Sequence, residues 1–393
     1  MKNVLLYYSF SFSFGGGEPL PLSLAAALQK TSRLTLALDV PEKLEPAIRL
    51  CGIPVDTSAM DVVKVSRPGY DPLRHSARDS LYRSRRLKAL AAGADVCISA
   101  ANVMDFGRPG HHFINMLAFG DDAFTAHVFG PRHPSLPASP LARAKRGLSE
   151  TLLRPLLGMR SKRAIIRDPA ERVYPNSAFV ERLMAEFYGP FNSTVFYPPT
   201  LFAPAPAADV RRDPLTILCL GRIIPEKGIP GLVAVVERAR AATGLDLRFR
   251  VAGRLDQDPA HGRELRRLAA TRPWLDFPGP LHGADKEAFL LSGTYALHAL
   301  RTEAFGISVT EYLKAGLIPV VPDTGGAAEV VDSPDLSFRD DAHATRILAN
   351  LVSNAPFRDA CARHCATRAA LFSPQAYLDR QTALLTRILA DSP

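Results

Sequence analysis

At 393 residues, with 47% hydrophobic and 22% charged residues, the chain has the composition of a globular protein and is long enough for two hydrophobic cores. No uncharged apolar run reaches the length of a membrane-spanning helix. The formal net charge is +9, but no nucleic-acid-binding module or aromatic platform accompanies the basic residues, which argues against a nucleic-acid partner.

The first half alternates apolar runs with helical patterns, which predicts a parallel, doubly wound α/β sheet. Its first strand ends before a glycine trio, Gly15, Gly16 and Gly17, which favours a strand and its loop over a signal peptide. The glycines would let the backbone approach a ligand; a plain flexible loop is the alternative. We expect strands at 2–9, 34–40, 61–65, 95–99, 125–130, 164–167 and 194–199, and helices at 19–31, 41–50, 78–92, 140–157 and 177–187.

Residues 132–172 carry ten basic and three acidic residues, a net charge of +7, with leucines interleaved. This pattern favours a basic amphipathic surface that contacts anionic lipid. A solvated pair of helices is the alternative, since Pro155 and Gly158 would interrupt a long helix lying on a membrane.

The second half repeats the alternation after a segment rich in proline and alanine. We expect strands at 215–221, 247–253, 275–277, 294–300 and 317–322, and a terminal helix at 375–390 that is capped by Ser373 and Pro374. The predicted organisation is a first domain at 1–200, a linker at 201–213, a second domain at 214–372 and a C-terminal helix at 373–393.

Two carboxylates, Glu303 and Glu311, flank a predicted strand, glycine turn and helix N-terminus. Free backbone N–H groups and the positive end of a helix dipole make such a junction an anion site. Carboxylates accept hydrogen bonds from sugar hydroxyls, so the pair would bracket a bound diphosphate. Ser308 and Glu311 also match a capping box, which needs no ligand. Upstream, Arg222 and Lys227 follow a strand-terminal glycine and would neutralise a diphosphate leaving group.

The segments 216-TILCLGRIIPEKG-228, 303-EAFGISVTE-311 and the following Gly325-Gly326 resemble the GT4 family of retaining glycosyltransferases, which have the GT-B fold. Together with 105-DFGRPG-110, 174-YPNSAFVERLMAEFYGP-190 and 197-YPP-199, they are similar to mannosyltransferases that add α-1,2-linked mannose from GDP-mannose to lipid-linked oligosaccharides. The resemblance implies two Rossmann-like domains facing a central cleft, with the donor on the second and the acceptor on the first. It also implies that the C-terminal helix returns to the first domain.

The resemblance further implies the site residues. The donor would be bound by Gly221, Arg222, Lys227, Arg254, Glu303, Phe305, Gly306, Ile307, Ser308 and Glu311. Glu303 would hold sugar hydroxyls, and Glu311 the ribose.

Near the reaction centre the family has a histidine, and the relatives place it where Asn115 stands here. His111 and His112 would substitute for it from a loop at the carboxyl end of a strand, or the Asn115 amide would make the hydrogen bond instead. His298 matches the relatives, and a core histidine is the alternative reading.

Metal chemistry is not expected. Asp256 and Asp258 form D-x-D, but Asp258 before Pro259 has the pattern of a helix cap. Cys361, His364 and Cys365 supply only three ligands. The cysteines, odd in number and scattered, favour free thiols in a reducing cytoplasm.

The predicted function is metal-independent, retaining transfer of a hexose, without a cofactor beyond the nucleotide sugar, to a glycan or polyprenyl-linked acceptor in the cytoplasm, with peripheral contact at the membrane face. The alternatives are an enzyme that uses a UDP-sugar on a soluble acceptor and an inactive nucleotide-sugar-binding protein.

Overall fold

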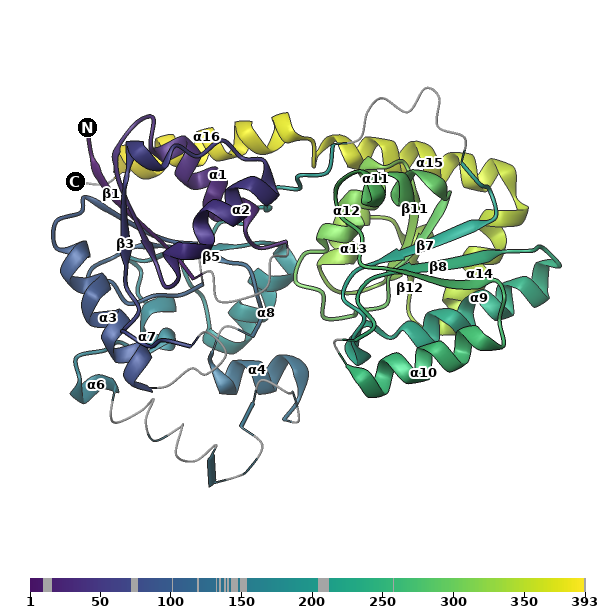
Figure 1. Ribbon diagram of the computed structural model, residues 1–393, viewed down its shortest axis with the longest axis horizontal. Coiled ribbons are helices and arrows are strands. Elements are labelled where there is room, and N and C mark those ends of the chain that lie inside the picture. The colour runs from purple at the N-terminus through teal and green to yellow at the C-terminus, as the bar shows by residue number, and fades with distance from the viewer. Residues whose placement is uncertain are drawn as a thin grey trace. The chain divides into compact units, whose positions relative to one another are not determined.

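The chain forms two compact units, residues 1–201 with 377–393, and residues 202–376. The computed structural model (Figure 1) describes residues 1–9, 16–71, 77–100, 102–118, 120–131, 133, 136–137, 139, 141–142, 148, 154–203, 212–256 and 258–391. The predicted linker at 201–213 therefore lies largely outside the described residues, as does much of the basic segment at 132–172.

The first unit is built on a parallel sheet with the strand order β3-β2-β1-β4-β5-β6. The strands are β1 (Asn3–Tyr8), β2 (Arg33–Leu38), β3 (Asp61–Lys64), β4 (Val96–Ser99), β5 (His111–Ile114) and β6 (Arg172–Pro175). The helices are α1 (Pro19–Leu28), α2 (Leu44–Cys51), α3 (Ala77–Ala91), α4 (Asp122–Phe129), α6 (Arg154–Leu156), α7 (Lys162–Ile166) and α8 (Ala178–Tyr188), with 3-10 turns η1 (Pro41–Lys43) and η2 (Thr57–Ala59).

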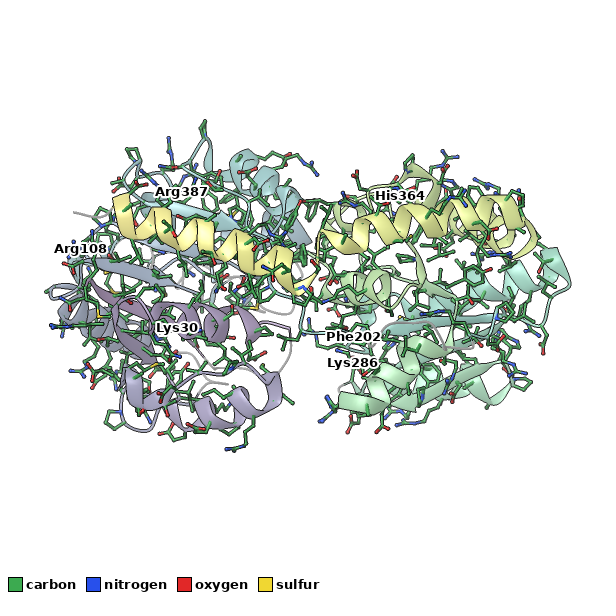
Figure 2. The ribbon with its side chains drawn as sticks, turned by 90° about the horizontal axis from the view of Figure 1, so that it is seen from above. Lys30, Arg108, Phe202, Lys286, His364 and Arg387 are labelled. Carbon is green, nitrogen blue, oxygen red and sulfur yellow. The ribbon has the colours of Figure 1, made fainter. Side chains whose placement is uncertain are left out.

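Alternation along β1 gives the first unit a core on each face of its sheet. Val4, Leu6 and Tyr8 pack with leucines of α1 and α2 on one face, whereas Leu5 and Tyr7 pack with residues of α3 on the other. The first face is completed by the last helix of the chain, α16 (Pro374–Asp391), which contributes Tyr377, Leu384, Leu385 and Ile388 (Figure 2, where Arg387 marks this helix).

The second unit has a parallel sheet of order β12-β11-β10-β7-β8-β9. The strands are β7 (Thr216–Leu220), β8 (Arg248–Ala252), β9 (Leu275–Gly279), β10 (Tyr295–Leu297), β11 (Ile318–Pro322) and β12 (Ser337–Phe338). The helices are α9 (Ile229–Thr243), α10 (Pro259–Ala270), α11 (Gly283–Ser292), α12 (Ile307–Lys314), α13 (Gly326–Val331), α14 (Asp341–Ser353) and α15 (Ala355–Ala370), with 3-10 turns η5 (Pro225–Lys227) and η6 (Pro334–Leu336).

The α/β prediction with two doubly wound parallel sheets is confirmed, but several elements of the first half were wrong. The segments 125–130 and 164–167, predicted as strands, instead form the ends of helices α4 and α7 and the cap residues that follow them. Residues 194–199 supply no named strand, and the bridge nearby joins Val173 to Ser193. Strands β5, β6 and β12 were missed, because each has only two to four residues and too short an apolar run to stand out.

The helix caps at Ser373 and Asp258 are confirmed, since each side chain accepts backbone N–H groups of the helix that follows. The five cysteines are free thiols. Among the described helices, none combines the length and apolarity needed to cross a bilayer.

Candidate functional site

In the second sheet the strand order reverses between β10 and β7, and doubly wound folds bind ligands at such switch points. The loop after β7 carries Gly221 and Arg222 and ends in η5, which contains Lys227. The loop after β10 carries His298 and Glu303 and leads into α12. The topology therefore brings the two charged motifs of the sequence together at one edge of the sheet.

Lys227 and Glu303 form an ion pair at this edge, with the ammonium Nζ 2.6 Å from carboxylate Oε2. The ring Nε2 of His298 lies 3.3 Å from the same oxygen, but it lacks hydrogen-bond geometry and has no other partner among the described residues. Burial opposes ionisation of Glu303, yet His298 and Lys227 outweigh it and hold the pKa of this carboxyl well below its usual range. Burial also lowers the pKa of His298, although its contact with Glu303 opposes this shift. His298 is thus both a core residue, at 3% exposure, and a neighbour of the candidate site.

The double glycine fixes the position of Glu303. A Cβ on Gly325 would lie 2.7 Å from the carbonyl oxygen of Arg301, and a Cβ on Gly326 would lie 2.4 Å from that of Ala304. The Gly326 N–H donates to the Glu303 carbonyl oxygen at 2.7 Å. Only residues without a side chain can pack this closely against the loop, so the Gly-Gly pair holds the Glu303 backbone in place.

Helix α12 begins at Ile307 and is capped by Gly306, whose φ is 102°. No side chain caps it, so the capping-box interpretation of Ser308 and Glu311 is wrong: Ser308 lies inside the first turn rather than at the cap. The first backbone N–H groups of a helix have no intrahelical partner, and the lack of a side-chain cap leaves them for a ligand. Phe305 is only 2% exposed and packs on Phe372, so its side chain supports the loop rather than facing the site.

Glu311 is 6% exposed, and its Oε1 lies 2.6 Å from Nζ of Lys286 on α11. Its other oxygen has no hydrogen-bond partner in the described part of the chain. Burial lowers the pKa of the nearby Lys314 to about 8, although Glu311 opposes the shift. Sequence reasoning missed Lys286 because no local motif links it to a carboxylate on a different helix.

Two exposed guanidinium groups follow adjacent strands at the same edge, Arg222 after β7 and Arg254 after β8. Arg222 forms no ion pair with another described residue, and Arg254 Nε lies 3.8 Å from Oδ1 of Asp256. An internal space of about 10 Å³ lies under this edge, lined in part by Gly221, Lys227 and His298, and holds at most one water.

The histidines of the first unit are not where the sequence analysis placed them. His111 and His112 lie inside β5 rather than on a loop at its carboxyl end. His112 is fully buried, and its Nε2 lies 2.9 Å from Oε2 of Glu171. His111 lies at the first position of the strand, where burial and nearby positive groups lower its pKa to about 3. Both rings belong to the packing of the sheet.

Asn115, by contrast, directly follows β5 at the carboxyl edge. Its Nδ2 donates to the Ala100 carbonyl, and its backbone N–H donates to Oδ1 of Asn102, a residue with φ of 64°. Asn176 follows β6 and donates from Nδ2 to the Asn115 carbonyl, while its own buried Oδ1 has no partner among the described atoms. Three amides from the ends of neighbouring strands therefore converge at this edge.

The glycine loop after β1 is described only in part. Gly15 lies outside the described residues, and Gly16 and Gly17 precede α1. A Cβ on Gly17 would meet Tyr8 Oη at an ordinary 3.5 Å, so the structure itself does not require glycine there. In the described part of the chain, no group of three or more potential metal ligands occurs.

The fold and its charged switch point define the chain as a two-domain α/β protein of the GT-B class, and comparisons agree. With 13% sequence identity and a TM-score of 0.65, HepE of Anabaena, solved in complex with UDP and glucose, is similar over 100% of both chains. Sucrose-phosphate synthase from Thermosynechococcus elongatus has 14% identity and a TM-score of 0.66 over 100% of both chains. WaaG, a glycosyltransferase of lipopolysaccharide biosynthesis, has 13% identity and a TM-score of 0.64 over 98% of this chain and 99% of its own.

The family model for Glycosyl transferases group 1 matches residues 206–363, which span most of the second unit. The match covers less than half of the chain, and together with the shared fold it supports a glycosyltransferase activity. No curated protein matches the chain in sequence.

Proposed function

We propose that this glycosyltransferase takes a hexose from a nucleotide sugar bound at the switch point of the second sheet, with GDP-mannose as the favoured donor. The observation that carries the proposal is the ion pair of Lys227 with Glu303 beside the uncapped N-terminus of α12. Arg222, Lys227 and the helix N-terminus supply the positive groups that a departing diphosphate needs.

The two carboxylates have different roles in this proposal. Glu303 is held ionised and accepts hydrogen bonds from hydroxyls of the transferred sugar. Glu311 offers its second oxygen to the ribose hydroxyls while Lys286 holds the first. Gly306, Ile307 and Ser308 contribute backbone N–H groups to the phosphates.

Retention of configuration without a metal is part of the proposal. The acceptor hydroxyl attacks the anomeric carbon from the face that the diphosphate leaves, and its proton passes to a leaving phosphate oxygen. Asn115 is an amide and cannot take this proton at neutral pH, so it would orient a hydroxyl instead. An experiment that determines the anomeric configuration of the product tests this directly; an inverted product would reject the mechanism.

A UDP-sugar is the second candidate donor, because HepE, which shares the fold, was solved with UDP-glucose. Release of nucleotide from GDP-mannose, UDP-glucose and UDP-galactose, each without acceptor, separates the two. Preferential release of GDP supports the first proposal, UDP release supports the second, and no release from any donor counts against both.

The proposed acceptor is a glycan, and a polyprenyl-linked one would bring the enzyme to a membrane through the basic segment at 132–172. Of its described arginines, Arg160 pairs with Asp168 and Glu171, two of the three carboxylates already counted in the net charge of +7. Cosedimentation with anionic and neutral liposomes at rising salt tests the contact. Electrostatic binding should fade as the Debye length falls from about 10 Å to about 3 Å, and equal binding to both lipids would reject it.

A further inference from the structure

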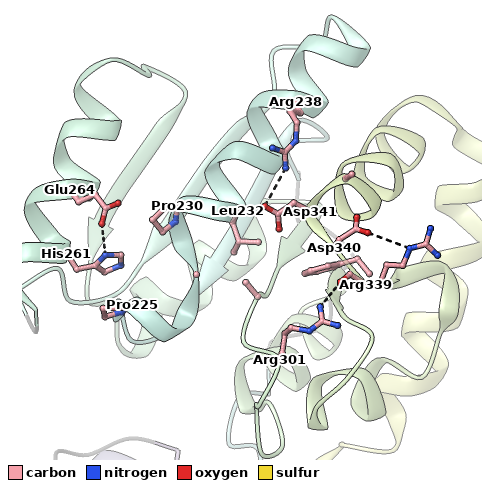
Figure 3. Close-up of a pocket in the computed structure, with 15 residues that line it drawn as sticks. Pro225, Pro230, Leu232, Arg238, His261, Glu264, Arg301, Arg339, Asp340 and Asp341 are labelled. Atoms are coloured by element: carbon pink, nitrogen blue, oxygen red, sulfur yellow. Dashed lines mark hydrogen bonds and ion pairs between the residues drawn. The ribbon is translucent and has the colours of Figure 1, made fainter. Parts of the chain in front are cut away.

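A groove of the second unit lies away from the charged switch point, among helices α9, α10 and α14 (Figure 3). Its volume is about 1020 Å³, at the upper end of the range of about 300 to 1,000 Å³ that is usual for small-molecule sites. Neither Lys227, Glu303 nor Glu311 lines it. Pro225 and Arg301 do, and they belong to the two loops that carry Lys227 and Glu303. The groove and the donor site therefore share loops but not side chains.

Charged side chains of both signs alternate around the groove. Arg238 lies 3.6 Å from Asp341, and Arg339 lies 3.6 Å from Asp340. Both separations exceed normal hydrogen-bond length, and all four side chains are about half exposed or more. These groups consequently retain donors and acceptors for a ligand. Figure 3 shows the four side chains beside the groove.

The lining is electrically balanced. Its arginines are Arg238, Arg301 and Arg339, and its carboxylates are Glu264, Asp340 and Asp341. A polyanion or a polycation would therefore meet as many like charges as opposite charges in this groove. A neutral ligand with many hydroxyl groups suits this arrangement, because each hydroxyl donates to a carboxylate and accepts from a guanidinium.

Apolar side chains lie between the charges. Pro225 and Pro230 line the groove and offer surfaces for the C–H faces of sugar rings, while Leu232 and Phe338 are buried beneath. An aliphatic chain would bury the same surfaces, but it would also strip water from the charged groups without replacing their hydrogen bonds.

His261 adds an independent sign that a ligand is missing. It lines the groove and is 7% exposed. Its Nδ1 lies 3.0 Å from Oε2 of Glu264, while its Nε2 is buried without a partner among the described residues. A buried polar atom left without a hydrogen bond is costly, at about 1 to 3 kcal/mol. A ligand hydroxyl in the groove would supply that bond.

We propose that this groove binds a neutral oligosaccharide at a site separate from the nucleotide-sugar site. The ligand places its hydroxyls among the paired charges and its ring faces on the two proline surfaces. For a glycosyltransferase such a site would hold the body of a glycan while one end is extended. The inference goes beyond the proposed donor chemistry and does not depend on which nucleotide is used.

Calorimetry with the full-length protein and neutral manno- and gluco-oligosaccharides tests the proposal. Ala342→Tyr fills the groove from an exposed position at the start of α14, and Arg339→Ala removes a guanidinium but keeps the carbonyl that Arg301 binds. Each should weaken oligosaccharide binding about tenfold, or about 1.4 kcal/mol. Arg346→Ala on the same helix and Ala360→Tyr on α15 are matched controls at exposed positions outside the groove, and both should bind like the unchanged protein.

Three outcomes would overturn the proposal: no binding at millimolar oligosaccharide, binding that Ala342→Tyr and Arg339→Ala leave unchanged, or stronger binding of an acidic oligosaccharide such as oligogalacturonate. Glu303→Gln separates the two sites, because it should abolish nucleotide release while leaving oligosaccharide binding intact. Loss of both on Glu303→Gln would show that the oligosaccharide occupies the donor site instead.

Discussion

The carboxyl edges of the two sheets present different chemistry on the same architecture. In the second unit, Lys227, Glu303 and Glu311 form an edge of paired charges. In the first unit, Asn102, Asn115 and Asn176 form an edge of neutral amides. Charges stabilise a departing diphosphate, whereas amides orient hydroxyls without titrating near neutral pH. In the proposed mechanism the second unit therefore stabilises charge, and the first unit positions a hydroxyl group.

The largest expected effect tests whether the histidines of the first unit are structural. Glu171 is 2% exposed. Its carboxylate accepts hydrogen bonds from the Gly110 N–H and from Arg160, and it also contacts the ring of His112. Removing one partner of a buried charge network typically costs about 3 to 5 kcal/mol, so Glu171→Ala should lower the free energy of unfolding by that order. Chemical denaturation measures it. His112→Gln should likewise reduce stability but leave turnover per folded molecule unchanged; a hundredfold loss of turnover would return His112 to the reaction centre.

Lys227→Ala tests the charged edge. If Lys227 neutralises the leaving diphosphate, turnover at saturating donor should fall by about 10² to 10³, or about 3 to 4 kcal/mol. Arg222→Ala should act in the same direction. Thermal unfolding is the control, because Arg222 is exposed and its loss should leave the melting temperature nearly unchanged. Full turnover in either variant would place that side chain off the phosphates.

Asn115 tests the amide edge. Loss of one neutral hydrogen bond is worth about 1 kcal/mol, so Asn115→Ala should slow turnover several-fold to tenfold. Asn115→His is the sharper variant, since it introduces a titratable ring at the position where the resemblance implies a histidine. We expect its pH–rate profile to gain an ionisation near pH 6.5, about the usual value for histidine. A profile identical to that of the unchanged enzyme would show that position 115 does not reach the reacting groups.

Lys286→Met should weaken nucleotide binding by a few-fold, because it frees the Glu311 carboxylate from the partner that orients it. Lys286→Arg should largely restore affinity. The distinguishing readout is the difference in affinity between a nucleotide and its 2′,3′-dideoxy analogue: it should shrink in Lys286→Met and in Glu311→Ala. If the difference persists in both, the carboxylate does not bind the ribose.

A further expected effect concerns pH and stability. The folded pKa of His111 is about 3, below its usual 6.5, so between these values the unfolded chain binds a proton that the folded chain does not. The stability that depends on an unprotonated His111 is fully present above pH 6.5. It is lost as pH falls, by at most about 1.4 kcal/mol of unfolding free energy per pH unit. Chemical denaturation at pH 7 and pH 5 should show that His111→Asn loses less unfolding free energy than the unchanged protein when the pH is lowered. Equal losses would mean that His111 is already solvated.

Local sequence was informative where the site is built from short segments. The loop with Arg222 and Lys227 and the turn between Glu303 and Glu311 each lie within a few residues of a strong strand, so strand, glycine and helix patterns located them. The residues that pair with these motifs lie in other segments of the chain. Lys286 reaches Glu311 across 25 residues, and no motif of one chain segment encodes such a contact.

The histidine error has a related cause. His111 and His112 follow Pro109-Gly110, a pair that favours a turn, and only four residues separate that turn from the end of β5. Polar residues at the start of so short a strand have no apolar periodicity to reveal it. A Cβ on Gly110 would lie 2.8 Å from the Phe106 ring, so the glycine is needed for packing beside the strand rather than for a ligand loop.

The return of α16 to the first unit has a consequence for the order of synthesis. The ribosome releases residues 202–376 as one continuous unit, but the first unit lacks Leu384, Leu385 and Ile388 of its core until the last residues emerge. The domain begun first is therefore completed last, the reverse of the usual N-terminal-first order. Nascent chains stalled before residue 377 should hold a protease-resistant second unit beside a first unit that is still readily cleaved.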